Sequence, residues 1–154
     1  MQALPHVYSV AAAGAEQGSV KLSAAGVPPL LSAAPAEFDG PGDRWSPEYL
    51  LAGAIASCFI LSFRAVARAA RLSWTHLDCH VDGTLERVEG ILQFTRVVVH
   101  ATLTVPAGSS TLLCERALEK AEKGCLVASS LRGSRELRIE IVKGFNEEPQ
   151  RKAV

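Results

Sequence analysis

The sequence predicts an α+β domain in which antiparallel sheets pack around a long buried helix. Two weakly alternating stretches near the N-terminus and two long alternating stretches in the middle are separated by turn residues, as in β-hairpins. Two helical segments interrupt these strands without strict βαβ alternation, which favours an antiparallel α+β arrangement. The 154 residues, about 48% of them apolar, suit one domain with one core. We therefore expect a single domain over 1–154, with a frayed, charged tail from about 146 to 154.

The N-terminal third is expected to hold a hairpin, a loop and the start of a helix. Residues 7–13 and 19–24 flank a glycine-containing turn and predict the hairpin. Residues 26–42 are rich in proline and glycine, which predicts a long loop with one short strand near Leu30. Ser46 can cap a helix that begins with Pro47, and Glu48 then places a carboxylate at the positive end of that helix.

This helix is expected to continue to about Arg71. Its first half is apolar on every face, and its arginines appear only in the second half. A helix that is apolar all round is normally covered by protein, so we expect its first half, which includes Cys58, to be enclosed. The uncharged run from Leu50 to Phe63 is about fourteen residues long. That is shorter than the roughly twenty residues that span a bilayer, so we expect no membrane partner.

The second half of the chain is expected to fold as a long hairpin, a helix and a last strand. Residues 73–88 and 91–105 alternate in polarity on either side of a Glu-Gly turn. Ser109 or Ser110 can cap a second helix, which Gly124 closes. Residues 136–142 form the last strand. The inner face of the second helix is expected to hold Leu112, Leu113, Leu118 and Ala121.

Composition excludes several classes of function. Sixteen basic and sixteen acidic residues give a formal net charge of zero, so no field attracts the protein to nucleic acid. The N-terminus has neither the basic start nor the apolar stretch of a secretory signal, and we expect a cytoplasmic protein. Four cysteines in that reducing compartment are too few and too widely spaced for a disulfide scaffold. Redox or nucleophilic thiol chemistry is the remaining interpretation.

One histidine-rich stretch imitates a metal site. His76, Asp78 and His80 alternate along a predicted strand, where alternate residues lie roughly 6.6 Å apart, so the outer pair is separated by about 13 Å. One metal ion cannot bind all three. The sequence contains no Cys-x-x-Cys pair and no glycine-rich phosphate loop. We therefore expect no metal and no cofactor.

Three segments carry the most specific signal, namely RWSPEYLLAG at 44–53, ASCF at 56–59 and AEKGC at 121–125. A Pro-Glu helix start lies ten residues before a cysteine in an apolar helix, and a second cysteine follows a Lys-Gly helix end. Together these segments resemble the OsmC/Ohr family of thiol-dependent peroxidases, in a divergent branch. The resemblance implies an OsmC-like fold in an intertwined homodimer. It also implies that Cys58 is the peroxidatic thiol, that Cys125 resolves it as a disulfide, and that Glu48 and an arginine tune the site.

The same resemblance implies the partners of the reaction. The substrate would be an organic hydroperoxide, and an external dithiol, for which a lipoyl-bearing protein is one candidate, would restore the two thiols. No metal, haem or flavin is implied. Two other functions on the same fold stay open, which are non-catalytic binding of a small apolar ligand and redox sensing through one stoichiometric oxidation.

Apart from the family resemblance, thiol chemistry itself predicts a cation beside Cys58. A peroxidatic cysteine must react as a thiolate, yet burial among neighbours such as Ile55 and Phe59 would raise its pKa. Where relatives carry an early arginine this sequence holds Glu16 or Glu37. The nearest substitute is Arg44, which its neighbour Asp43 could instead hold in a surface pair.

Spacing along the helix bears on assembly and on substrate. Glu48 and Cys58 are ten residues apart, which is roughly 15 Å along a helix axis, so the carboxylate cannot reach the thiol. A site at a homodimer interface, or an intervening arginine, would supply the missing geometry.

We expect the approach to Cys58 to be apolar, which favours organic hydroperoxides over hydrogen peroxide. The residues expected to line it are Trp45, Leu51, Ile55 and Phe59. The other two cysteines, Cys79 and Cys114, are expected to be packing residues.

Overall fold

The structure is a computed structural model that describes residues 3–144. It divides the chain into two compact units, one that ends at Leu51 and one that begins at Ala52. The single domain expected over 1–154 stays a prediction. The frayed tail expected from about 146 lies outside the described residues.

The N-terminal unit contains a small antiparallel sheet. Its strands β1 (Ala11–Ala13), β2 (Val20–Ser23) and β3 (Leu30–Ser32) pair in chain order. The first two strands form the predicted hairpin, and the third is the strand expected near Leu30. A single 3₁₀ turn (Ala36–Phe38) follows in the loop. The strands are shorter than the alternating stretches because turns and the proline-rich loop limit them.

The long helix α1 (Pro47–Ala70) begins where the sequence predicts. The backbone N–H of Tyr49 donates to Oγ of the buried Ser46 at 3.2 Å, which is the expected N-terminal cap. At the other end the Leu72 N–H donates to the Ala67 carbonyl at 2.9 Å, and Arg71 adopts a left-handed conformation with φ of 52°. This is a common way to end a helix, usually with glycine in the left-handed position.

Helix α1 buries only one stripe of side chains. Ile55, Phe59, Phe63 and Ala67 recur every fourth residue and are buried, whereas Leu61 is 57% exposed. The described chain therefore does not enclose the first half of the helix on every face, as the sequence led us to expect. By length and composition alone α1 could also cross a membrane, although core helices of soluble proteins pass the same test. One apolar face of α1 is therefore exposed in the described part of the chain, and burying it against another surface would be favourable.

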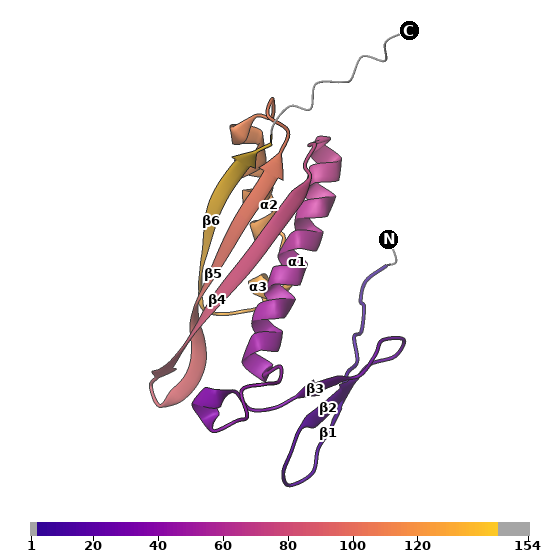
Figure 1. Cartoon of the computed structure of the whole chain (residues 1–154), viewed down its shortest axis with the longest axis vertical. Helices are drawn as coiled ribbons and strands as arrows, with labels where there is room; N and C mark the ends of the chain where they lie inside the picture. Colours follow the sequence, from indigo (N-terminus) through magenta and orange to yellow (C-terminus); the bar gives the residue numbers. More distant parts are fainter. Residues whose placement is uncertain (1–2, 145–154) are drawn as a thin grey trace. The chain divides into compact units, whose positions relative to one another are not determined.

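The C-terminal unit is built on a second sheet (Figure 1), in the order β4 (His76–Val88), β5 (Ile91–Val105) and β6 (Ser134–Lys143). β4 and β5 form the predicted long antiparallel hairpin. β6 pairs with β5 in parallel, which differs from the antiparallel arrangement that we expected. The reason is the helical connection between them, which returns the chain to the end of the sheet where β5 began. The α+β fold class is confirmed.

Two helices form that connection, α2 (Thr111–Lys123) and the short α3 (Leu126–Ser129). The Leu113 N–H donates to Oγ of Ser110 at 3.4 Å, so Ser110 is the cap. Leu118 and Ala121 face inward as predicted, but Leu112 and Leu113 are 54% and 57% exposed, so their inward placement is wrong. The buried stripe has the ideal spacing for one helix face, and both leucines fall outside it. Its members are Cys114, Ala117, Leu118 and Ala121.

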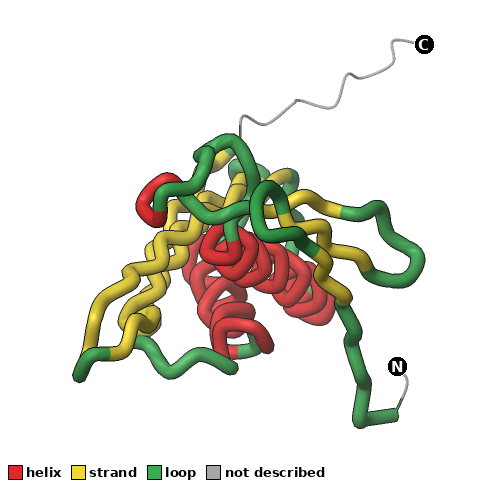
Figure 2. Tube along the Cα trace, turned by 90° about the horizontal axis from the view of Figure 1, so that it is seen from below, coloured by secondary structure: helices red, strands yellow, loops and turns green. Residues whose placement is uncertain are grey.

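Both long helices lie on the same side of the β4–β5–β6 sheet (Figure 2). The core between them and the sheet comes from alternate residues of β5, such as Val99, Ala101 and Leu103, and from the buried stripes of the helices. Trp74 meets the Phe63 ring edge to face at 5.3 Å. This arrangement brings the turn after α2 against α1.

Candidate thiol site

Cys58 lies in the fourth turn of α1, next to the buried stripe. Its helical neighbours Ile55 and Phe59 are buried in the core, while Cys58 itself is half-buried. The thiol is therefore sheltered by protein but within reach of solvent. Ile55 and Phe59 belong to the core rather than to an open approach. Trp45 is 51% exposed in the N-terminal unit, so its lining role stays a prediction.

Cys125 lies at the junction of α2 and α3. Gly124 closes α2 by donating its N–H to the Lys120 carbonyl at 3.1 Å, and Cys125 is the residue from which α3 starts. The Cys125 carbonyl accepts from the Ser129 N–H at 3.0 Å. Cys125 is 1% exposed, because a new helix begins at once and turns the thiol inward.

The two thiols meet although they are 67 positions apart in the sequence. The Cys125 thiol donates to the Ile55 carbonyl oxygen of α1 at 3.9 Å, and it also lies close enough to Cys58 to act as a donor that lowers the pKa of Cys58. A thiol has one proton to donate, and a thiolate is a stronger acceptor than a carbonyl. The Cys125 thiol therefore has two acceptors within reach, the Ile55 carbonyl oxygen and the sulfur of an ionised Cys58.

The surroundings of Cys58 lower its pKa without a cation. Burial is the largest single influence and raises the pKa, as the sequence argument anticipated. Hydrogen bonds outweigh it and hold the pKa below its ordinary value. The donors, in decreasing order of effect, are the Val127 backbone, the Cys125 thiol, the Leu126 backbone and the Ser62 hydroxyl.

The surroundings of Cys125 act in the opposite sense. Burial, followed by the hydrogen bond to Cys58 and the negative charge on it, raises the pKa of Cys125 to about 11. Backbone hydrogen bonds from Ala128 and Val127 offset part of this rise. The site therefore contains one thiol that ionises readily and one that keeps its proton near neutral pH.

The remaining cysteines occupy different environments. Cys114 is fully buried on α2 and has a raised pKa, chiefly from burial, as a packing residue should. Cys79 on β4 is half-buried, and burial together with the charge of Cys125 raises its pKa to about 11. Cys79 thus lies close enough to Cys125 to feel its charge, a proximity that the sequence did not indicate.

Glu48 lies in the N-terminal unit, in the first turn of α1. It lines a small cavity of about 130 Å³ together with Glu37, Phe38 and Tyr49. One of its carboxylate oxygens, Oε2, is buried and accepts no hydrogen bond from the described residues 3–144. A buried carboxylate oxygen without a donor is costly, so this position calls for a partner.

Arg44 pairs with its neighbour. Its Nη1 lies 2.9 Å from Oδ2 of Asp43 and 3.0 Å from the Asp43 carbonyl oxygen, and both side chains are exposed. Of the two interpretations left open by the sequence, this is the surface pair. Whether Arg44 ever serves the thiol stays a prediction.

The donors to the Cys58 thiolate are the functional groups that sequence reasoning missed. Ser62 lies four residues after Cys58, one helical turn away on the same face, and that spacing could have indicated it. The backbone donors at Leu126 and Val127 carry no residue-type signal, because any sequence that starts a helix after Cys125 would supply them.

Three histidines of the sheet are hydrogen-bonded to aspartates. His76 lies 3.1 Å from Asp78, and Asp82 bridges His80 at 2.9 Å and His100 at 2.8 Å. The hydrogen bond with His100, followed by the one with His80, lowers the pKa of Asp82. Within residues 3–144, no group of three or more His, Cys, Asp or Glu side chains has the geometry of a metal site.

Comparison with known proteins adds a family and a set of related folds. A family model described as OsmC-like protein matches residues 40–140. The chain is 26% identical over 109 residues to the uncharacterized protein YmaD of Bacillus subtilis (strain 168), which covers 69% of this chain and 73% of that protein. An OsmC-like protein of unknown function from Vibrio cholerae has a similar structure, with a TM-score of 0.78 at 18% identity, covering 90% of this chain and 100% of that one. An organic hydroperoxide resistance protein OsmC from Legionella pneumophila gives a TM-score of 0.71 at 25% identity, covering 92% and 99%.

Proposed function

The chain belongs to the OsmC-like protein family, and from that premise we propose that it is a thiol-dependent peroxidase that reduces organic hydroperoxides through Cys58 and Cys125. One neighbour in the structural comparison is described as an organic hydroperoxide resistance protein, which supports this substrate class. The observation that carries the proposal is the contact between two thiols whose pKa values are displaced in opposite directions.

The first step assigns attack to Cys58. Its thiolate attacks the terminal oxygen of the hydroperoxide, the O–O bond breaks, and the alkoxide leaves and takes a proton from solvent to become an alcohol. Cys58 is oxidised to a sulfenic acid. The lowered pKa of Cys58 supports this assignment, since the thiolate is the nucleophile and a half-buried position leaves it within reach of a substrate.

The second step assigns resolution to Cys125. Its sulfur attacks Cys58 Sγ, a disulfide forms, and hydroxide leaves and is protonated to water with the proton that Cys125 gives up. Oxidation of Cys58 removes the negative charge that raises the pKa of Cys125. Cys125 therefore becomes more acidic only once a sulfenic acid is there to be resolved. An external dithiol in the cytoplasm then reduces the disulfide and is itself oxidised.

We propose further that the active form is a homodimer. In the described chain α1 buries only one stripe, and its exposed Leu61 and the buried, undonated Oε2 of Glu48 both call for groups from elsewhere. A second copy of the chain would cover the apolar face and supply a donor to Glu48. This answers the spacing problem between Glu48 and Cys58 without requiring Arg44 to leave its pair with Asp43.

Peptide mapping after one equivalent of cumene hydroperoxide tests the proposed thiol roles. The native chain should yield a Cys58–Cys125 disulfide, and Cys125→Ser should leave Cys58 as a sulfenic or sulfinic acid. Cys114→Ser is the matched control, because Cys114 lies on the same helix face as the core and should leave the disulfide intact.

Two outcomes would contradict the proposal. A dominant disulfide from Cys58 to Cys79, or between two chains, would show that the resolving role has been assigned to the wrong residue. One stoichiometric oxidation without turnover in the presence of a dithiol would instead identify a redox sensor, and no oxidation at all would favour a ligand-binding protein.

A further inference from the structure

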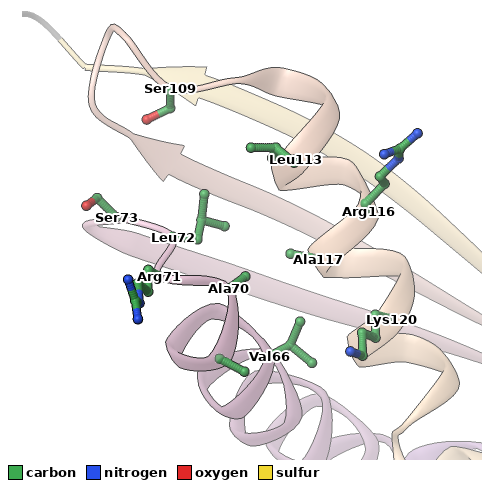
Figure 3. Close-up of a pocket in the computed structure, with 11 residues that line it drawn as sticks. Val66, Ala70, Arg71, Leu72, Ser73, Ser109, Leu113, Arg116, Ala117 and Lys120 are labelled. Carbon is green, nitrogen blue, oxygen red and sulfur yellow. The ribbon is translucent and has the colours of Figure 1, made fainter.

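A second cavity lies in the C-terminal unit, away from the thiols. It occupies about 450 Å³ between the last turns of α1, the turn that follows them and one face of α2 (Figure 3). This volume falls within the range of small-molecule sites. Val66, the cavity residue closest in sequence to Cys58, is eight residues further along α1, or about 12 Å along the helix axis. None of the four cysteines lines the cavity.

The floor of the cavity is apolar. Val66 and Ala70 of α1, Leu72 of the turn, and Leu113 and Ala117 of α2 surround it (Figure 3). Leu113 is 57% exposed although the helical pattern led us to expect it inside. An exposed leucine beside a half-formed apolar pocket marks a surface that gains stability when an apolar group covers it.

The rim of the cavity is cationic. Arg71, Arg116 and Lys120 line it, and no carboxylate does. Within residues 3–144 no ion pair engages any of these three side chains. Arg116 and Lys120 are four residues apart on α2, an arrangement in which like charges repel. An anion at this rim would meet three cationic lining side chains and no carboxylate.

The backbone at Arg71 supports a role for its side chain. Arg71 closes α1 with φ of 52°, in a left-handed position where glycine is the usual residue. In Figure 3 Arg71 and Arg116 lie on opposite edges of the cavity, and Lys120 lies beside Val66. An arginine at this costly position adds a positive charge to the edge that α2 cannot reach.

We propose that this cavity binds a free, single-chain carboxylate, with the chain on the apolar floor and the carboxylate at the cationic rim. The two remaining polar groups, the hydroxyls of Ser73 and Ser109, are too few to recognise a sugar or a nucleobase by hydrogen bonds. No aromatic ring lines the cavity to stack on a nucleobase. The site is independent of the thiol chemistry proposed above, because it shares no residue with it.

Calorimetric titration with decanoate tests the site on the full chain. Decanoate should bind saturably, with one molecule per chain, whereas decyltrimethylammonium, which has the same chain and the opposite charge, should bind at least tenfold more weakly. Lys120→Glu should weaken decanoate binding at least tenfold. Lys123→Glu is the matched control, since it reverses a charge on the same helix outside the cavity and should leave binding unchanged.

A steric variant locates the ligand. Ala70→Trp, at an exposed position on the edge of the cavity, should abolish decanoate binding while the far-ultraviolet circular dichroism stays native. Unchanged binding in Ala70→Trp, or equal affinity for the two decyl ions, would overturn the proposal. Absence of saturable decanoate binding would also overturn the proposal. If Leu113→Arg then sediments as a lighter species than the native chain, a second copy of the chain covers the cavity.

Discussion

Replacement of Cys58 with alanine is expected to lower the pKa of Cys125. In the native chain burial, and then the hydrogen bond and the charge of Cys58, raise that pKa from an ordinary 9.0 to about 11. The Cys58→Ala variant loses both contributions of Cys58 and keeps the burial. The pKa of Cys125 should therefore fall to a value between these two limits.

The size of the effect follows from the shift. At pH 8 a thiol with a pKa of about 11 is about 0.1% thiolate. Each pKa unit by which the variant falls below the native value raises this thiolate fraction about tenfold.

The assay is alkylation of Cys125 by limiting iodoacetamide as a function of pH, read by mass spectrometry of the Cys125 peptide. The pH midpoint is compared rather than the rate, because Cys125 is buried and poor access slows every sample. Cys114→Ala is the control, since Cys114 does not contribute to the pKa of Cys125 and its removal should leave the midpoint unchanged. A midpoint that stays at the native value, or rises, in Cys58→Ala would refute the coupling on which the ordered mechanism depends.

Three further predictions concern stability. Gly133→Ala should destabilise the fold by about 1–3 kcal/mol in urea melts, because a Cβ there would lie 2.9 Å from the Phe94 carbonyl oxygen. Gly108→Ala is the control, and it should leave the free energy of unfolding unchanged because open space surrounds that position. Equal effects of the two substitutions would contradict this explanation. Phe63→Ala should cost about 3–5 kcal/mol, since its ring is fully buried, and a loss below 1 kcal/mol would show that the core is not packed as described. The lowered pKa of Asp82 contributes stability that is present above the unfolded value of about 3.9 and is lost as the pH falls through the folded value. Asp82→Asn should therefore be less stable than the native chain at pH 6 and equal to it near pH 2. A loss of stability that grows in acid would contradict the sign of this effect.

Local signals in the sequence predicted most of the secondary structure. Ser46 and Ser110 cap the helices as expected, and Gly124 ends α2, because capping depends on residues within one turn. The parallel pairing of β6 was not predicted, since it depends on the path of a whole connection rather than on the strand itself.

The candidate site was only partly predictable. Cys58 and Cys125 were singled out through the resemblance to the OsmC/Ohr family, and the structure brings them together. The sequence argument required a cation to lower the pKa of Cys58, whereas hydrogen bonds lower it here. Backbone donors such as Val127 have no residue-type signature, so a sequence cannot reveal them. The outward position of Leu113 was missed because helix periodicity gives a stripe but not its edges.

Steady-state turnover of cumene hydroperoxide with excess dithiothreitol tests the central claim most directly. The proposed mechanism predicts many turnovers for the native chain, none for Cys58→Ser, and for Cys125→Ser a rapid decline as Cys58 is oxidised beyond the sulfenic acid. Turnover by Cys58→Ser at the native rate would contradict the assignment of Cys58 as the thiol that attacks the peroxide.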